Sequence, residues 1–117
     1  MESLATAAHR ELIEETGYEA QEMKLLTSGP PSPGLSAEMV HVFRTRGLRR
    51  VGAGGGDATE DITVHEVSMS QIVPWLEAKA AEGRMIDPKV YSGLFFAILE
   101  RENSVLDGKS IPELQRV

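Results

Sequence analysis

Three glutamates stand close together near the start of the chain, at positions 11, 14 and 15, directly after Arg10. On a helix, spacings of three and four residues place these three carboxylates on one side. Like charges at this spacing cost roughly 0.2–0.5 kcal/mol per pair, and the last turn of a helix favours cations over anions. A hard divalent cation with oxygen ligands would relieve both penalties, and Mg²⁺ is the usual choice beside phosphate. The residues alone leave a second interpretation open, which is a solvated acidic stripe on a helix surface.

A helix over Ser3 to Thr16 is predicted to carry these glutamates. Alanines at positions 5, 7 and 8 are strong helix formers, and leucine or alanine recurs at positions 4, 8 and 12. Ser3 suits the N-cap, and Gly17 suits the residue that ends the helix. Arg10 lies four residues before Glu14 and can pair with it, which would offset part of the repulsion.

The rest of the chain alternates between turn-forming stretches and apolar segments. Three prolines between Ser28 and Gly34 exclude a helix or a strand there, and Gly52 to Gly56 is predicted to be a flexible loop. Short strands are expected near residues 23–26, 39–46 and 62–67, and helices near residues 70–82 and 88–101. This order of elements indicates an α/β or α+β layer arrangement. Three short strands are few for a sheet, so we expect the beginning of the domain to be missing.

The composition excludes several classes of protein. With 117 residues the chain is one domain at most, and its net charge of −6 argues against a nucleic-acid backbone as the main partner. No apolar run approaches the roughly 18–20 residues that span a bilayer, so no membrane partner is expected. Cysteine is absent, which excludes disulfides and thiolate metal sites and fits a cytoplasmic protein. The three histidines are too scattered for a zinc site.

The glutamate segment is part of a longer pattern. Glu2 is followed by Arg10-Glu11-Leu12-x-Glu14-Glu15-x-Gly17-Tyr18, and this pattern resembles the Nudix box. In that family the box is a glycine, five residues, a glutamate, seven residues, and then Arg-Glu-aliphatic-x-Glu-Glu-x-Gly-aliphatic. Glu2 stands at the required interval before Arg10. Tyr18 departs from the last aliphatic position, and the box glycine would fall upstream of Met1.

The resemblance implies a role for each acidic residue of the segment. Glu11 and Glu15 would be direct Mg²⁺ ligands, with Mn²⁺ as the alternative ion, and Glu14 a further ligand directly or through water. Arg10 would orient Glu14 rather than touch the substrate. Glu2 would support the site from the loop before the helix.

The resemblance also implies the fold. Nudix domains are α/β/α sandwiches with a mixed sheet, and residues 1–103 would be the C-terminal portion of such a domain, with the N-terminal strands missing. Residues 104–117 would then be a polar tail.

Two downstream features resemble the ADP-ribose pyrophosphatase branch of the family. Pro33 lies sixteen residues after Gly17, as a proline does in that branch, and Pro33, Gly34 and Glu38 would belong to its substrate-binding loop. A simple turn at Pro33-Gly34 and a surface charge at Glu38 are the alternatives.

The segment from Thr59 to Val64 resembles the catalytic loop of the same branch. Glu60 aligns with the glutamate that reaches the metal and helps to activate the attacking water. The branch can carry a second acid two residues earlier, but this chain has Ala58 there, with Asp57 adjacent. This departure leaves the identity of the general base open.

The function implied by the resemblance is Mg²⁺-dependent hydrolysis of ADP-ribose, a small-molecule nucleotide substrate, to AMP and ribose 5-phosphate, by a cytoplasmic homodimer. Two alternatives stay open. One is a catalytically inactive Nudix remnant that binds metal or a partner chain, and the other is a Nudix hydrolase for a nucleotide sugar such as GDP-mannose.

Overall fold

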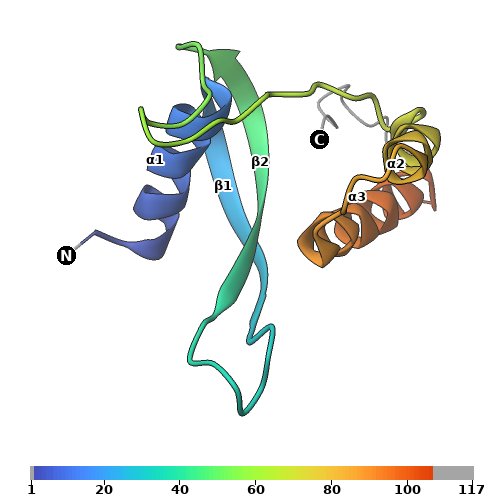
Figure 1. Cartoon of the computed structure of the whole chain (residues 1–117), viewed down its shortest axis with the longest axis horizontal. Helices are drawn as coiled ribbons and strands as arrows, with labels where there is room; N and C mark the ends of the chain where they lie inside the picture. Colours follow the sequence, from blue (N-terminus) through green and yellow to red (C-terminus); the bar gives the residue numbers. More distant parts are fainter. Residues whose placement is uncertain (1, 107–117) are drawn as a thin grey trace. The chain divides into compact units, whose positions relative to one another are not determined.

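The computed structural model describes residues 2–106, and the side chains of residues 2–103. The chain divides between Val64 and His65 into two compact units. The first unit contains helix α1 (Leu4–Thr16) and strands β1 (Tyr18–Gly29) and β2 (Val40–Arg50), and the second contains helices α2 (Ile72–Ala81) and α3 (Pro88–Leu106) (Figure 1). The α/β fold class expected from the sequence is confirmed.

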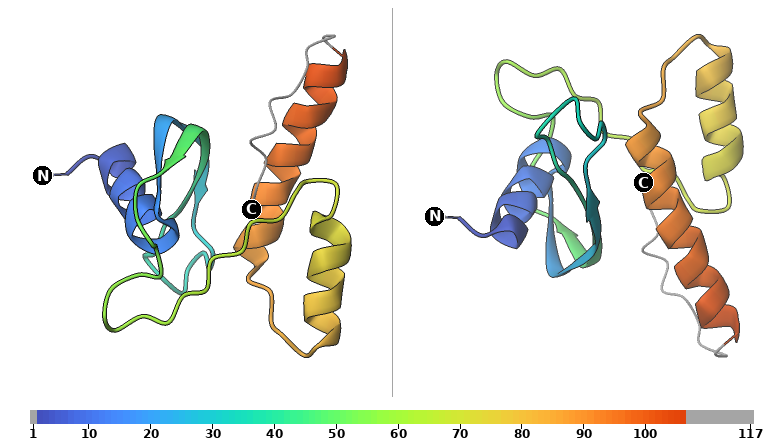
Figure 2. Two further views of the ribbon diagram at one scale, coloured as in Figure 1. Left: turned by 90° about the horizontal axis from the view of Figure 1, so that it is seen from above. Right: turned by 90° about the horizontal axis from the view of Figure 1, so that it is seen from below.

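Helix α1 begins and ends where the sequence predicts. The Ser3 hydroxyl accepts a hydrogen bond from the Thr6 N–H at 3.1 Å, which satisfies one of the free donors of the first turn. At the other end, Gly17 adopts φ +80° and donates its N–H to the Ile13 carbonyl at 2.9 Å. The helix lies alongside β1 (Figure 2), and the Ala20 N–H donates to Nε2 of His9 at 3.0 Å.

Strands β1 and β2 form an antiparallel hairpin. Their register runs from Tyr18 opposite Arg50 to Gly29 opposite Val40, with one irregularity between Leu25 and Thr27. The predicted strands lay in the right places, but both observed strands are longer. Charged residues near the ends of the two strands interrupt the apolar alternation from which strands are predicted. In the structure they pair across the strands, as Glu19 does with Arg49 at 2.7 Å.

The third predicted strand, over residues 62–67, is wrong. This segment of the described chain forms neither a helix nor a strand, and it makes no ladder with β1 or β2. An extended, β-branched sequence becomes a strand only where a neighbouring strand accepts and donates its backbone hydrogen bonds.

The two late helices are confirmed, although α3 continues to Leu106. Residues 107–117, which make up most of the predicted polar tail, lie outside the described residues.

The second unit contains the hydrophobic core found among the described residues. Val67, Ile72, Leu76 and Leu94 are buried, and partly buried apolar side chains, including Trp75, pack against them. The Trp75 ring also lies 5.1 Å from the His65 ring and 5.4 Å from Nζ of Lys79. Within the described residues, no helix has both the length and the apolar character needed to cross a membrane.

The core of the second unit predicts unequal effects at two adjacent positions of α2. Ile72 is 1% exposed and Val73 is 50% exposed. Ile72→Ala should therefore lower the free energy of unfolding by about 2–4 kcal/mol, because it leaves a cavity. The control Val73→Ala should change it by less than about 0.5 kcal/mol. Urea unfolding followed by the fluorescence of Trp75 measures both, and equal losses would contradict the assignment of this core.

Candidate functional site

The last two turns of α1 carry the acidic cluster, which consists of Glu11, Glu14 and Glu15. All three side chains are exposed. The last turn of this helix contains no basic residue, so no lysine or arginine within that turn offsets the negative end of the helix dipole. The penalties expected from the sequence are therefore present in the structure.

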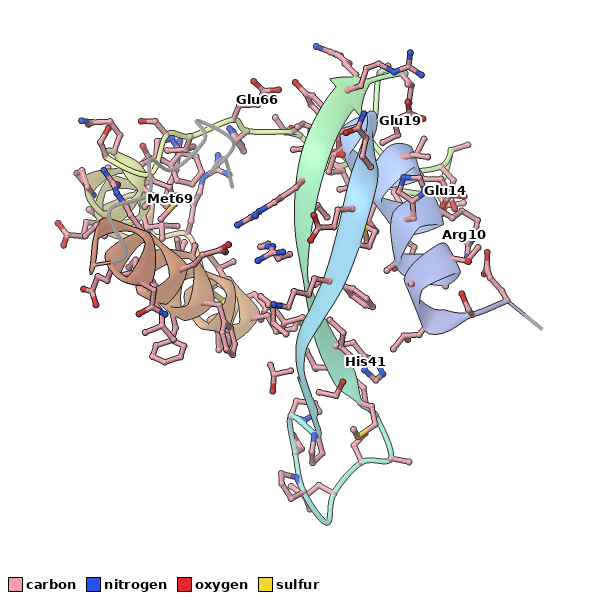
Figure 3. All side chains as sticks on the ribbon, turned by 180° about the vertical axis from the view of Figure 1, so that it is seen from behind. Arg10, Glu14, Glu19, His41, Glu66 and Met69 are labelled. Carbon is pink, nitrogen blue, oxygen red and sulfur yellow. The ribbon has the colours of Figure 1, made fainter. Side chains whose placement is uncertain are left out.

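Arg10 connects this cluster to Glu2, which lies two residues before the first residue of the helix (Figure 3). Its Nε and Nη2 each donate to one carboxylate oxygen of Glu2 at 3.1 Å, and its Nη1 lies 3.4 Å from Glu14. These contacts, first of all the hydrogen bond to Glu2, raise the pKa of Arg10, and the same bond lowers the pKa of Glu2. The Arg10 guanidinium therefore lies between the carboxylates of Glu2 and Glu14.

A glycine-rich loop closes the end of α1. The Gly55 N–H donates to the Glu15 carbonyl at 2.8 Å, and the Gly56 N–H donates to the Glu14 carbonyl at 2.9 Å. The last carbonyls of a helix have no partner within the helix, so these two bonds satisfy groups that would otherwise need water. The sequence predicts a flexible loop here, whereas the structure docks the loop on the helix end. The run of glycines shortly before an acidic segment is the only sequence signal for this docking.

The same loop brings Glu60 to the acidic cluster. Although the Glu15 side chain is largely exposed, partial desolvation of its carboxylate raises its pKa, and the charges of Glu11, Glu60 and Glu14 raise it further, in that order. Glu60 therefore acts electrostatically on the helix end although it is distant in sequence. Asp57 instead accepts hydrogen bonds from the hydroxyl and N–H of Thr59, at 2.5 and 2.7 Å, which lower its pKa.

The predicted substrate-binding residues Pro33, Gly34 and Glu38 lie elsewhere. They belong to the loop between β1 and β2, at the opposite end of the hairpin from the C-terminus of α1 (Figure 1). The strands separate the two ends by roughly 35 Å, at about 3.3 Å per residue. The structure does not bring this group to the acidic cluster within one chain.

The carboxylates fit a divalent cation by their chemistry. Glu11, Glu14, Glu15 and Glu60 offer only oxygen donors, which suit Mg²⁺, and their mutual repulsion at Glu15 is the kind that a cation removes. Among the described residues, no group of three or more acidic or histidine side chains is already gathered to hold an ion. Exposed side chains can turn between rotamers without moving the backbone, so gathering them requires no change of fold.

The profile of the NUDIX domain family matches residues 1–94. The chain is 36% identical to a methanol dehydrogenase activator from Bacillus methanolicus over 73 residues, which are 62% of this chain and 40% of that protein. It is 40% identical to a GDP-mannose pyrophosphatase from Escherichia coli O1:K1 over 70 residues, which are 58% of this chain and 37% of that protein. The matched region spans about two fifths of the length of these curated relatives.

The raised pKa of Glu15 predicts a gain in stability when its charge is removed. The ordinary value is 4.5, and a folded-state value above it means that ionised Glu15 costs stability at every pH above the folded pKa. As the pH falls through the folded pKa to 4.5, the carboxyl is protonated in the folded protein and the cost disappears. Glu15→Gln should therefore raise the metal-free melting temperature at neutral pH but not below pH 4.5.

Thermal unfolding in a chelating buffer, followed by circular dichroism, measures this effect. The control is Glu38→Gln in the distant hairpin loop, which should leave the melting temperature unchanged at both pH values. A rise for Glu15→Gln that is equally large at both pH values would contradict the electrostatic cause.

Proposed function

This chain belongs to the NUDIX domain family, and we propose that it hydrolyses the diphosphate bond of a nucleoside diphosphate linked to a sugar, with Mg²⁺ as cofactor. One observation carries the proposal, namely that a docked loop brings Glu60 to the glutamates at the end of α1. A solvated acidic stripe would have no need of a fourth carboxylate delivered from another part of the chain.

Each residue of the cluster has a defined task in this proposal. Glu11 and Glu15 would hold Mg²⁺ directly, with Glu14 and Glu60 as further ligands. When bound, the ion neutralises charge on the diphosphate and makes a coordinated water more acidic. Glu60 accepts the proton of the water that attacks one phosphorus, and the bond from that phosphorus to the bridging oxygen breaks. The products are a nucleoside monophosphate and a sugar phosphate.

Arg10 and Glu2 act on this chemistry indirectly. The two bonds from Arg10 to Glu2 fix the guanidinium plane, and the same guanidinium then restrains the Glu14 carboxylate. A planar fork of donors does this better than a lysine, which is a point charge on a flexible stem. Arg10 is thus proposed as a positioning residue rather than one that touches the substrate.

Two substrates are candidates within the proposed class. GDP-mannose is supported by the relative from Escherichia coli O1:K1, whose name is GDP-mannose pyrophosphatase. ADP-ribose is supported by the spacing of Pro33 after Gly17, which resembles the ADP-ribose pyrophosphatase branch. Both consist of a nucleoside diphosphate joined to a sugar, so the acidic cluster suits either, and groups outside it would distinguish them.

A substrate panel with matched variants tests the proposed function. The purified chain should release GMP from GDP-mannose or AMP from ADP-ribose only when Mg²⁺ is present. Glu15→Gln should abolish this activity, and Glu60→Gln should lower kcat by about 10²–10⁴-fold, the usual contribution of a general base. Glu77→Gln, an exposed change on α2, is the control and should leave the activity intact.

The outcomes separate the alternatives. If the purified chain binds Mg²⁺ but hydrolyses no diphosphate in the panel, the proposed enzymatic activity is wrong. The alternative of a catalytically inactive, metal-binding remnant would then remain. A clear preference for one nucleotide sugar would decide between the two substrates. Full activity of Glu15→Gln would remove the acidic cluster from the reaction.

A further inference from the structure

The segment Val51–Gly56, here called the glycine latch, joins β2 to the loop that carries Glu60. We propose that the latch is a positioning element that holds Glu60 at the acidic end of α1, and that Gly56 sets the course of the Glu60 side chain. The catalytic consequence of this inference rests on the proposed function, whereas the docking itself does not.

Backbone hydrogen bonds fasten the latch at both ends. At its start, the N–H groups of Val51 and Gly52 donate to the Gly17 carbonyl at 2.7 and 3.1 Å. At its end, Gly55 and Gly56 donate to the last carbonyls of α1, those of Glu15 and Glu14. The end of the latch therefore bonds to the backbone of two residues whose side chains belong to the acidic cluster, so its position follows theirs.

The approach of the two backbones requires glycine. A Cβ added to Gly54 would lie 2.6 Å from the Thr16 carbonyl carbon and 2.8 Å from the Glu15 carbonyl oxygen. These are backbone atoms, which cannot turn away as the end of a flexible side chain could. Gly54 also has φ +71°, a conformation that residues with a side chain rarely adopt.

Gly56 acts on Glu60 itself. A Cβ at Gly56, where φ is +81°, would lie 2.8 Å from both Cβ and Cδ of Glu60 and 3.0 Å from its Oε2. The Glu60 side chain thus passes directly over the bare face of Gly56, and its Oε1 accepts a hydrogen bond from the Asp57 N–H at 3.3 Å. A methyl group at position 56 would occupy this path and displace the carboxylate.

The latch predicts a specific kinetic defect. Gly56→Ala should lower kcat by about 10–100-fold and leave KM within about twofold, because a displacement of a catalytic group by about 1 Å can cost that much. Gly83→Ala is the matched control, since Gly83 also has a positive φ, +88°, but an added Cβ there meets no atom within 4 Å. It introduces the same kind of backbone strain without the contact, and it should retain wild-type kcat.

A double-mutant cycle separates positioning from folding. If Gly56 acts through Glu60, then Gly56→Ala should lower kcat almost no further in a Glu60→Gln background, because the carboxylate that Gly56 positions is absent. Gly56→Ala would reduce activity by the same factor in both backgrounds if it merely destabilised the chain. Such additivity would overturn the positioning role.

Amide hydrogen exchange tests the docking without any activity. The amides of Gly55 and Gly56 should be protected like those within α1 when metal is absent, and Gly54→Ala should expose both and weaken the binding of Mn²⁺ measured by electron paramagnetic resonance. Fast exchange at both glycines in the unaltered chain would overturn the latch. The amides could be protected in the unaltered chain, and Mn²⁺ binding weakened by Gly54→Ala, while the chain hydrolyses no diphosphate. That result would support the docking of the latch and contradict the proposed function.

Discussion

Negative charge at the C-terminus of α1 is the constraint around which the first unit is organised. The end of a helix already carries partial negative charge on its unsatisfied carbonyls, and this helix adds three carboxylates there. The surrounding chain answers in two ways. Arg10 spreads its positive charge between Glu2 and Glu14, and the loop glycines donate N–H groups to the terminal carbonyls. At the Glu15 carboxylate, partial desolvation and then the charges of the neighbouring glutamates raise the pKa.

The repulsion among these glutamates lowers the stability of the folded state, and a bound cation would remove it. The first unit is poorly placed to absorb such a cost by packing, since the buried apolar side chains of the described residues belong to the second unit. Its hairpin carries exposed ion pairs such as Glu19 with Arg49, and exposed pairs contribute only about 0–1 kcal/mol each. Ligand binding stabilises whichever state it favours, so occupation of the acidic cluster would affect the stability of this unit as well as its chemistry.

Family membership does not by itself decide the substrate. Of the two relatives compared, one is named a methanol dehydrogenase activator and the other a GDP-mannose pyrophosphatase, although both match this chain at 36–40% identity. One fold commonly supports several functions, and selectivity comes from the groups placed around a shared site. In this chain the predicted substrate-binding residues, among them Glu38, lie at the far end of the hairpin from Glu15. Under the proposed function, recognition of the base and the sugar would therefore depend on groups other than those that cleave the diphosphate.

The sequence by itself determined what depends on local spacing. The limits of α1, the shared face of its glutamates and the pairing of Arg10 with Glu14 all follow from helical periodicity and capping, which act within a few residues. Tertiary structure decided what depends on distant partners. Residues 62–67 have the composition of a strand, yet they form no ladder with the strands of the described chain. The glycines at positions 52–56 suggested flexibility, yet Gly55 and Gly56 donate hydrogen bonds to a helix end about forty residues earlier. Local sequence limits the conformations that a segment can adopt, whereas only the rest of the fold supplies the hydrogen-bond partners that select one of these conformations.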